Sequence, residues 1–359
     1  MVKSTIIIPT YNRPEYLKWL LDYYHKYGND FDIVVADSSS AENKKLNRKI
    51  VLSFLDLNIQ YIDKYPEEVD PYHKFADMVN YAKEKYCVFC ADDDFVVPNG
   101  INQAVDFLEK NPDFTVTYGY YMGFLLKIKK QPRGGSEKQF HWQTYYPKKS
   151  ITFPKPEDRL FKHLSEYSGM LFYGVYRTDF LKIIYGELLN SKVDTVLFGE
   201  MLPGMLALIY GKTKCLDVFY MGRRLSSHIR CWPTLIDFKN QGRYDAEYVK
   251  FRQCLATHLS KKSQSSIGES KKIIDDAMSK YIKFSFNPFK RILEYNADRN
   301  RTFNKLYKGV RSIYRGARFI YRLVAGGNLN PLNSKYNFLP EYCDDFEKIK
   351  NQVIKSDII

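Results

Sequence analysis

The sequence predicts an α/β fold, in which a mostly parallel sheet with helices on both faces is followed by a helical C-terminal region. Over the first 125 residues, short apolar runs alternate with helical patterns. These runs are continuously apolar rather than alternating, which is typical of parallel strands buried on both faces. From residue 236 onward the pattern is helical throughout. Together these observations favour a Rossmann-like sheet with a helical extension.

Four apolar runs are predicted to be strands: Ser4–Pro9, Asp32–Ala36, Ile59–Ile62 and Tyr86–Ala91. A turn after the first strand leads into a helix, because Pro14 suits a first helical turn and Leu17, Leu20, Leu21 and Tyr24 share one face. Two further helices are predicted over residues 75–85 and 99–109, and another strand over 115–124. Residues 127–150 are predicted to be a basic, mobile loop.

The charge distribution places a domain boundary near residue 235. The whole chain carries a net charge of +14, of which residues 236–359 carry +11 and the preceding 235 residues only +3. We therefore predict a catalytic domain over 1–235, with a nucleotide-sugar half (1–125) and an acceptor half (126–235), and a basic, mostly helical region over 236–359.

Composition excludes several classes of protein. Hydrophobic residues make up 45% and charged residues 27% of the chain, which argues against disorder. No apolar run approaches the roughly 18–20 residues that span a bilayer, and no signal peptide is recognised. Cys87 and Cys90 have the C-x-x-C spacing, but no second pair follows, so two buried thiols are favoured over zinc. We expect a cytoplasmic protein with reduced cysteines.

The strongest chemical signal is the run Asp92-Asp93-Asp94, directly after a buried strand. Neighbouring carboxylates repel one another unless a cation lies among them, and a hard divalent ion holding a diphosphate is a usual solution. A solvated acidic turn is the alternative. Thr10 and Asp37 follow two other predicted strands, and ligands bind at the carboxyl ends of such strands. The three positions are therefore expected at one edge of the sheet.

Three segments together resemble the GT-A glycosyltransferases, specifically family-2-like enzymes: IIIPTYNRPEYL (6–17), VVADSSS (34–40) and VFCADDDF (88–95). The resemblance covers 1–125 closely and 126–235 loosely. It implies a metal-dependent hexosyltransferase of the kind used in polysaccharide biosynthesis. Such an enzyme moves a sugar from a nucleotide-diphospho-sugar, with a UDP-sugar favoured, to a saccharide or lipid-linked saccharide.

The resemblance also implies roles for individual residues. Four residues would line the nucleotide pocket: Pro9, Thr10, Tyr11 and Arg13. Asp37 would contact the base or the ribose, and Asp92 the ribose. Asp93 or Asp94 would reach Mn²⁺ or Mg²⁺ on the diphosphate. Lys74 lies where relatives often place a basic residue near the diphosphate; a surface lysine is the alternative.

Inverting members of this family need a further carboxylate as general base. Glu200, at the start of a strongly apolar helix, is the candidate, and Asp194 is the reserve. A carboxylate at a helix start can instead stabilise the helix dipole, by about 0.3–1 kcal/mol.

His228 follows a predicted strand, in the position where several GT-A enzymes complete the metal shell. Arg223, Arg224 and Arg230 surround it in sequence and could neutralise the leaving diphosphate. The alternative for this histidine is an ordinary surface position.

Residues 301–324 are predicted to form a helix with basic residues along one face and aromatic and aliphatic residues along the opposite face. This helix either lies on an anionic membrane at the inner face or packs on the catalytic domain. Nucleic acid is not expected as a partner, because the rest of the chain has little basic excess.

Two other functions remain open from the sequence. A nucleotidyltransferase also uses a metal at the sheet edge, but its first loop usually contains glycine, and PTYNRPEY has none. A non-catalytic membrane-surface protein with a degenerate transferase domain is the second, and the intact acidic residues argue against it.

Overall fold

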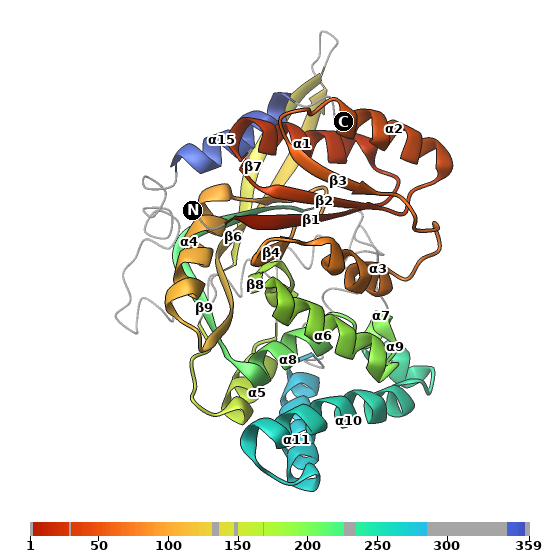
Figure 1. Cartoon of the computed structure of the whole chain (residues 1–359), viewed down its shortest axis with the longest axis vertical. Helices are drawn as coiled ribbons and strands as arrows, with labels where there is room; N and C mark the ends of the chain where they lie inside the picture. The colour runs from red at the N-terminus through yellow and green to blue at the C-terminus, as the bar shows by residue number, and fades with distance from the viewer. Residues whose placement is uncertain are drawn as a thin grey trace.

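The computed structural model describes residues 3–28, 30–130, 136–146, 150–167, 169–225, 235–285 and 343–355. Within them, nine strands form one sheet, in which β7 pairs with β6 and the others follow the order β3-β2-β1-β4-β8-β6-β9-β5. Helices α1, α2 and α15 cover one side of β1–β3, and α3 lies on the other (Figure 1). The predicted α/β fold with helices on both faces and a helical C-terminal region is confirmed.

The first half of the sheet is parallel, as predicted. β1 (Ser4–Thr10) pairs in parallel with β2 (Asp32–Asp37) and β4 (Tyr86–Phe89), and β2 pairs with β3 (Asn58–Ile62). The run Ile6–Ile8 is fully buried, because helices cover both faces of this central strand. α1 (Pro14–Tyr27) and α2 (Ala41–Leu52) connect these strands. All four residues predicted on the inner face of α1 are buried.

The helix predicted over 75–85 was wrong in its bounds. α3 spans Pro71–Met78 and is followed by a single 3-10 turn, η1 (Val79–Tyr81). Asp70 sets the start, since its side chain accepts hydrogen bonds from the backbone N–H of Tyr72 and His73, and Pro71 fits the first helical position. The helix therefore begins one turn earlier than its apolar pattern indicates.

The predicted loop over 127–150 was also wrong. β6 (Phe114–Lys130) extends far beyond its predicted end, and β7 (Ser136–Tyr146) pairs with it in an antiparallel hairpin. The sequence of β7 is rich in aromatic residues, which favour strands, and this outweighs its basic and polar character. Between β4 and β6 lie β5 (Phe95–Val96) and α4 (Pro98–Lys110), and α4 packs on β6 and β9 (Lys212–Arg224).

A cluster of helices lies below the sheet in Figure 1 and includes the first part of the C-terminal region. α5 (Pro156–Ser165), α6 (Thr178–Ser191) and α8 (Met201–Tyr210) belong to the middle of the chain. α10 (Tyr244–Ser263) packs on all three, and α11 (Ile267–Ser285) packs on α5 and α10. Three short helical elements lie along the same part of the chain: η2 (Gly169–Tyr173), α7 (Thr195–Phe198) and α9 (Leu235–Asn240). The short strand β8 (Val175–Arg177) belongs to the sheet, where it lies between β4 and β6.

The last described helix, α15 (Cys343–Lys355), returns to the N-terminal half of the chain. It packs on α1, β7 and β9. Gln352 exchanges hydrogen bonds with Trp19 of α1, donating to its carbonyl (3.1 Å) and accepting the indole N–H at its own carbonyl (3.0 Å). Phe346 stacks on Phe219 of β9, with ring centroids 4.2 Å apart. The C-terminal region is therefore attached to the sheet as well as to the helical cluster.

None of the helices in the described ranges is long and apolar enough to cross a membrane. The basic segment 301–324, predicted to contact a membrane or the catalytic domain, lies outside the described residues. The division of the chain at residue 235 stays a prediction.

The contact of α15 with β9 yields a stability test. Replacing Phe346 by Ala removes a ring that is only 8% exposed, so the free energy of unfolding should fall by about 3 kcal/mol. Chemical denaturation of the full chain measures this change. Phe153→Ala is the matched control, because that ring is 44% exposed and should cost little. Equal losses in the two variants would contradict docking of α15 on the sheet.

Candidate functional site

The carboxyl ends of three parallel strands meet at one edge of the sheet. Thr10 and Asp37 are register partners at the ends of β1 and β2. On the other side of β1, the backbone N–H of Cys90 donates to the carbonyl of Ile7 (2.9 Å), which fixes the end of β4. The acidic run follows as a turn closed by Asp94 N–H donating to the Ala91 carbonyl (3.1 Å). The structure thus brings the three predicted positions together.

Asp92 is fully buried and faces the loop after β1. Its Oδ2 accepts a hydrogen bond from Thr10 Oγ1 (2.8 Å), and Arg13 Nη2 lies 2.5 Å from its Oδ1, as an ion pair without hydrogen-bond geometry. Arg13 also donates to Asp93 Oδ2 (3.0 Å). Burial raises the pKa of Asp92 to about 7, against the opposing charge of Arg13. Arg13 therefore ties two of the three aspartates to the predicted nucleotide loop.

Asp94 faces the opposite way, toward the end of β9. Its Oδ1 accepts the backbone N–H of Arg224 (2.8 Å), and its Oδ2 lies 3.9 Å from Arg223 Nε. Burial, together with the negative charge of Asp93, raises the pKa of Asp94 to about 8. The guanidinium of Arg224 lies over the ring of Tyr16, 4.5 Å from its centroid. Arg13 from the loop after β1 and Arg223 at the end of β9 therefore bring positive charge to the acidic run.

The acidic run fits a hard divalent ion that is completed by its substrate. Burial of the carboxylates disfavours their negative charge, and a cation would relieve this. Their contacts direct Asp92 and Asp94 to different sides, so the run is not a closed protein cage. Mg²⁺ and similar ions are commonly held by one or two carboxylates plus substrate phosphates, which matches this arrangement.

Asp37 is fully buried and engaged by its own loop. Its Oδ1 accepts Ser39 N–H (2.7 Å), and its Oδ2 accepts Asn47 Nδ2 (2.7 Å) and the Tyr61 hydroxyl (2.6 Å). These contacts order the loop between β2 and α2. The part that Asp37 plays toward a base or ribose stays a prediction.

Lys74 is buried rather than on the surface, with 5% of the residue exposed. Its ammonium donates to the Thr10 carbonyl (3.2 Å) and to Ser38 Oγ (2.7 Å), linking the ends of β1 and β2. Burial lowers its pKa to about 8, although Asp92 and Asp37 act in the opposite direction. Lys74 therefore lies at the edge where Thr10 and Ser38 meet, and its contact with a diphosphate stays a prediction.

Asn12 is a functional-site residue that our sequence reasoning missed. Its φ of 51° is left-handed, a conformation that Asn adopts more readily than most residues. Its backbone N–H donates to Ser39 Oγ (2.7 Å), and its Oδ1 accepts Ser40 N–H (2.8 Å) and Asn43 Nδ2 (3.0 Å). Asn12 thereby joins the loops after β1 and β2. An Asn within the turn PTYNRP is the signal that could have identified it.

Glu200 lies at the N-cap position of α8. It is partly exposed, yet burial among its neighbours raises its pKa to about 7. The residue as a whole keeps some contact with solvent, while protein surrounds its carboxylate. Its negative charge raises the pKa of five surrounding tyrosines, namely Tyr72, Tyr167, Tyr173, Tyr176 and Tyr185.

Arg223 connects Glu200 with the acidic run. Its charge lowers the pKa of both Glu200 and Asp94. Its guanidinium lies 5.4 Å from the ring centroid of Tyr173. Burial raises the pKa of Tyr173, and the negative charges of Asp94 and Glu200 raise it further. Residues far apart in the sequence therefore form one electrostatically connected site.

Asp194, the reserve candidate for the base, is engaged elsewhere. Its Oδ1 caps α7 by accepting the N–H of Val196 (3.0 Å) and Leu197 (3.3 Å), and its Oδ2 forms an ion pair with Arg243. These contacts are those of a helix cap.

The other predicted positions are quickly placed. Pro9 and Tyr11 flank Thr10 and are partly exposed. His228 and Arg230 lie outside the described residues, so the proposed metal contact of His228 stays a prediction.

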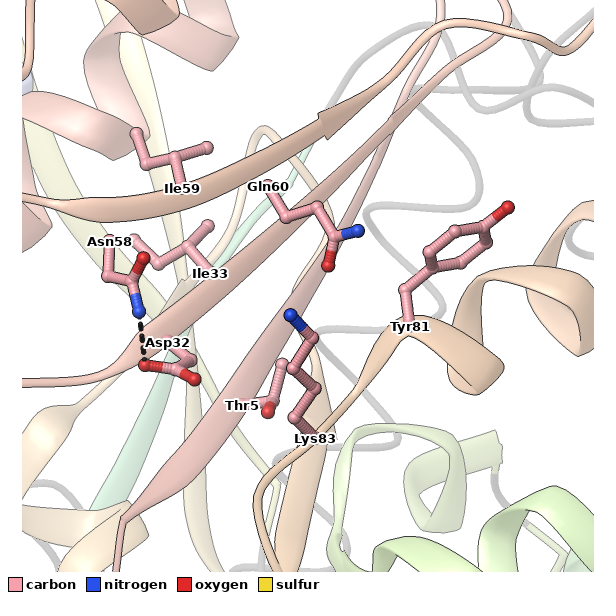
Figure 2. A pocket seen from close by; sticks show the side chains of 8 residues that line it. All are labelled: Thr5, Asp32, Ile33, Asn58, Ile59, Gln60, Tyr81 and Lys83. Atoms are coloured by element: carbon pink, nitrogen blue, oxygen red, sulfur yellow. Dashed lines mark hydrogen bonds between the residues drawn. The ribbon is translucent and has the colours of Figure 1, made fainter.

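A separate cavity of about 300 Å³ lies at the opposite, amino ends of the strands. Figure 2 shows its lining, where Asp32 accepts a hydrogen bond from Asn58 (2.8 Å) and Lys83 extends toward Gln60. Since Thr5, Asp32 and Asn58 open β1, β2 and β3, this cavity is remote from the acidic run.

Asn12 provides a test of how the two loops are held. Asn12→Ala removes the three hydrogen bonds of the side-chain amide and leaves alanine in a left-handed conformation, so the free energy of unfolding should fall by about 2 kcal/mol. Asn12→Gly should cost less, because glycine adopts this conformation without strain. Denaturant unfolding measures both, with Asn190→Ala on the exposed side of α6 as control. Equal stability of Asn12→Ala and wild type would exclude this role.

Comparison with known proteins finds a family match in the first half of the chain. Residues 5–165 match the family model described as Glycosyl transferase family 2. Comparison with curated proteins finds no match. Among solved structures, S. aureus TarS 1-349 in complex with UDP-GlcNAc is 16% identical, with 81% of this chain and 75% of that chain covered and a TM-score of 0.51.

Two further structures have lower TM-scores. Another structure of S. aureus TarS 1-349 is 15% identical, with 81% and 74% covered and a TM-score of 0.48. The mannosyltransferase PcManGT from Pyrobaculum calidifontis, in complex with GDP-Man and Mn²⁺, is 13% identical, with 86% and 84% covered and a TM-score of 0.42. Residues 5–165 therefore match glycosyl transferase family 2, and the fold and the acidic run at the sheet edge agree with the GT-A resemblance of the sequence.

Proposed function

We propose that the chain transfers a hexosyl group from a nucleotide-diphospho-sugar to a hydroxyl of a saccharide or lipid-linked saccharide, with inversion, and that Glu200 is the general base. The observation that carries this proposal is the connection made by Arg223 between Asp94 and Glu200. Because the charge of Arg223 acts on Asp94 at the sheet edge and on Glu200 at the start of α8, it supports a role for both carboxylates in one site.

In this reaction the acceptor hydroxyl oxygen attacks the anomeric carbon of the donor sugar. Glu200 takes the hydroxyl proton as the new glycosidic bond forms, and the bond to the nucleoside diphosphate breaks on the opposite face. The pKa of Glu200, about 7, suits a base that works near neutral pH. Arg223 and Arg224 lie at the end of β9, where their charge can stabilise the departing diphosphate.

A nucleotide-diphospho-sugar is supported as donor by both sequence and fold. The loop after β1 joins the end of β2 through Asn12, and Arg13 joins it to the aspartates. The complex of TarS with UDP-GlcNAc supports a UDP-sugar for this chain. Asp93 or Asp94 would hold Mn²⁺ or Mg²⁺, which would neutralise the diphosphate and polarise its leaving oxygen.

The surroundings of Glu200 support a saccharide acceptor. Tyr72, Tyr167 and Tyr173 are partly exposed, and each responds to the charge of Glu200. Tyrosine combines an apolar ring face with a polar hydroxyl, which suits the mixed surface of a sugar. An acceptor stacked on these rings would present a hydroxyl near the carboxylate.

Nucleotide binding tests the donor site. We expect UDP with Mn²⁺ to raise the melting temperature more than UDP or Mn²⁺ alone, because ligands that bind only the folded chain stabilise it. Asp94→Asn should lose the metal-dependent part, while its amide oxygen can still accept the Arg224 N–H. Thermal shift with UDP, GDP, ADP and CDP identifies the base at the same time.

Asp106→Asn, on the exposed side of α4, is the matched control and should behave as wild type. Absence of any metal-dependent shift with all four diphosphates would rule out the donor site proposed here.

The general base is tested by exchanging carboxylates for amides. Glu200→Gln should lower kcat by about 10²–10⁴-fold, whereas Asp194→Asn should retain most activity, since Asn also caps helices. For wild type, kcat should rise with pH and level off above about pH 7, because the base acts in its ionised form. The assay measures sugar transfer to the acceptor across pH 5–9. An active Glu200→Gln variant beside an inactive Asp194→Asn variant would refute the assignment.

Stability separates a catalytic defect from misfolding. The folded-state pKa of Glu200 lies above the usual value for Glu, so the ionised carboxylate destabilises the folded chain above about pH 7 and not below pH 4. Glu200→Gln should therefore be more stable than wild type at pH 8, by on the order of 3 kcal/mol, and nearly equal to it at pH 4. An inactive but stabilised variant supports the role as base.

A further inference from the structure

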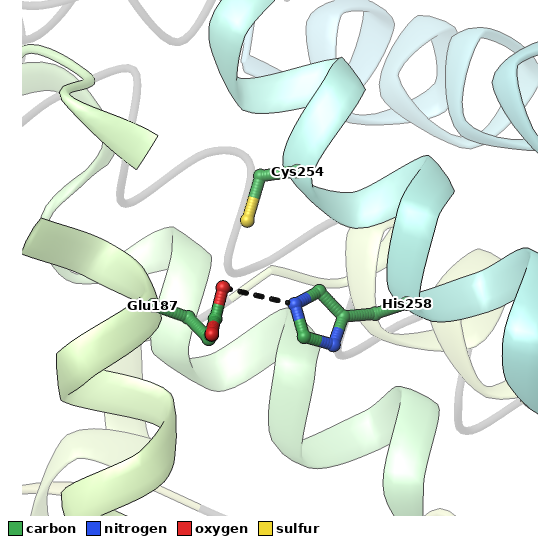
Figure 3. A group of neighbouring side chains, drawn as sticks. All are labelled: Glu187, Cys254 and His258. Atoms are coloured by element: carbon green, nitrogen blue, oxygen red, sulfur yellow. Dashed lines mark hydrogen bonds and ion pairs between the residues drawn. The ribbon is translucent and has the colours of Figure 1, made fainter. Parts of the chain in front are cut away.

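Three side chains of the kinds that bind metal ions meet between α6 and α10, near the C-terminal end of α8; Glu200 lies at the other end of that helix. Cys254 and His258 are four residues apart on α10, so they lie on one face of that helix. Glu187 reaches them from α6. Figure 3 shows the thiol, the carboxylate and the imidazole directed toward one common point.

The distances match those between the ligands of a single ion. One ligand atom from each of the three residues lies within 4.8 Å of the other two. The Nε2 of His258 lies 3.2 Å from Glu187 Oε2. With metal–nitrogen and metal–oxygen distances near 2.0–2.1 Å, two ligands of a tetrahedral zinc ion are about 3.3 Å apart.

The second imidazole nitrogen already has the partner that a metal-bound histidine requires. The Nδ1 of His258 lies 2.6 Å from the hydroxyl of Tyr210, the last residue of α8. Histidine ligands almost always donate their other N–H to an oxygen, which fixes the ring orientation and leaves the opposite nitrogen free for the metal. Tyr210 can accept this hydrogen bond.

The donor set selects the kind of metal. Thiolate, imidazole and carboxylate together suit zinc and similar first-row transition ions, whereas Mg²⁺ and Ca²⁺ prefer oxygen ligands alone. The side chain of His258 is 12% exposed and that of Glu187 is 33% exposed, so an ion can enter and a water can fill the fourth position. This chemistry differs from that of the acidic run at the sheet edge.

We propose that Glu187, Cys254 and His258 form a binding site for a zinc-like transition-metal ion that fastens α10 to α6 and, through Tyr210, to α8. Metal binding displaces the thiol proton of Cys254, and the sulfur binds as thiolate. Without a metal, burial and the charge of Glu187 raise the pKa of Cys254 to about 12. A bound cation reverses that effect. The site is independent of the glycosyl-transfer proposal.

Cobalt binding to the full chain is the experiment. Co²⁺ is added to metal-free protein in the presence of excess Mg²⁺, which occupies oxygen-only sites. We expect one equivalent to give visible bands of tetrahedral cobalt and a thiolate-to-cobalt charge-transfer band, and both to vanish when Zn²⁺ is added. Bound Zn²⁺ should also raise the melting temperature.

Variants locate the ion. Cys254→Ser should remove the charge-transfer band and weaken binding, while Cys215→Ser, another partly exposed cysteine, should leave both unchanged. Tyr210→Phe keeps all three ligands but removes the partner of Nδ1, and should weaken binding about 10–100-fold. Melting temperatures of the metal-free variants show that each still folds.

Several results would overturn the proposal. One is a wild-type chain that gives no charge-transfer band, which would mean that Tyr210, His258 and Glu187 are only a hydrogen-bonded chain. Another is a Cys254→Ser variant that binds Co²⁺ with the wild-type spectrum. Unchanged binding by Tyr210→Phe would remove the link to α8.

Discussion

The burial of two carboxylates at the end of β4 is the constraint on which the site depends. Burial raises the pKa of Asp92 and Asp94, because their charged forms are poorly solvated. The positive charges of Arg13, in the loop after β1, and of Arg223, at the end of β9, partly compensate for this loss of solvation. Thr10 and the backbone of Arg224 add hydrogen bonds. A metal ion with a diphosphate would therefore meet charged and hydrogen-bonding side chains that are already held in place.

This constraint explains why the loops at the sheet edge are so closely connected. Asn12, Lys74 and Asp37 contact the loops after β1 and β2, and none of the three is free to turn outward. The result is an ordered edge, since each of these polar groups is held by several partners, most of them from a neighbouring loop, helix or strand. Preorganised polar groups of this kind stabilise developing charge without having to reorganise during reaction.

The C-terminal region packs on two sets of elements that carry residues of the site. α15 packs on α1 and β9, and β9 ends at the two arginines beside Asp94. α10 packs on α6 and α8, and α8 begins at Glu200. The elements that hold the donor edge and the base in place are therefore both supported by residues beyond 235. A compositional boundary at this position does not prevent close packing across it.

The sequence by itself determined the parallel β1–β4 unit and the edge where Thr10, Asp37 and Asp92 meet. Continuous apolar runs can only be buried on both faces, and parallel strands place their ends together. It also indicated Glu200, through the apolar helix that follows it. The aromatic residues of 136–146 favour a strand, but a long basic segment resembles a loop when its partner strand is unknown.

Only the tertiary structure decided which partners each polar residue has. Asn47 and Tyr61 have no sequence motif, and the turn PTYNRP marks Asn12 but not its partners, because these contacts join segments that are distant along the chain. The same holds for Arg223 between Asp94 and Glu200, and for Glu187 opposite Cys254 and His258. Helical spacing places the last two on one face, but the packing of α6 on α10 supplies the third.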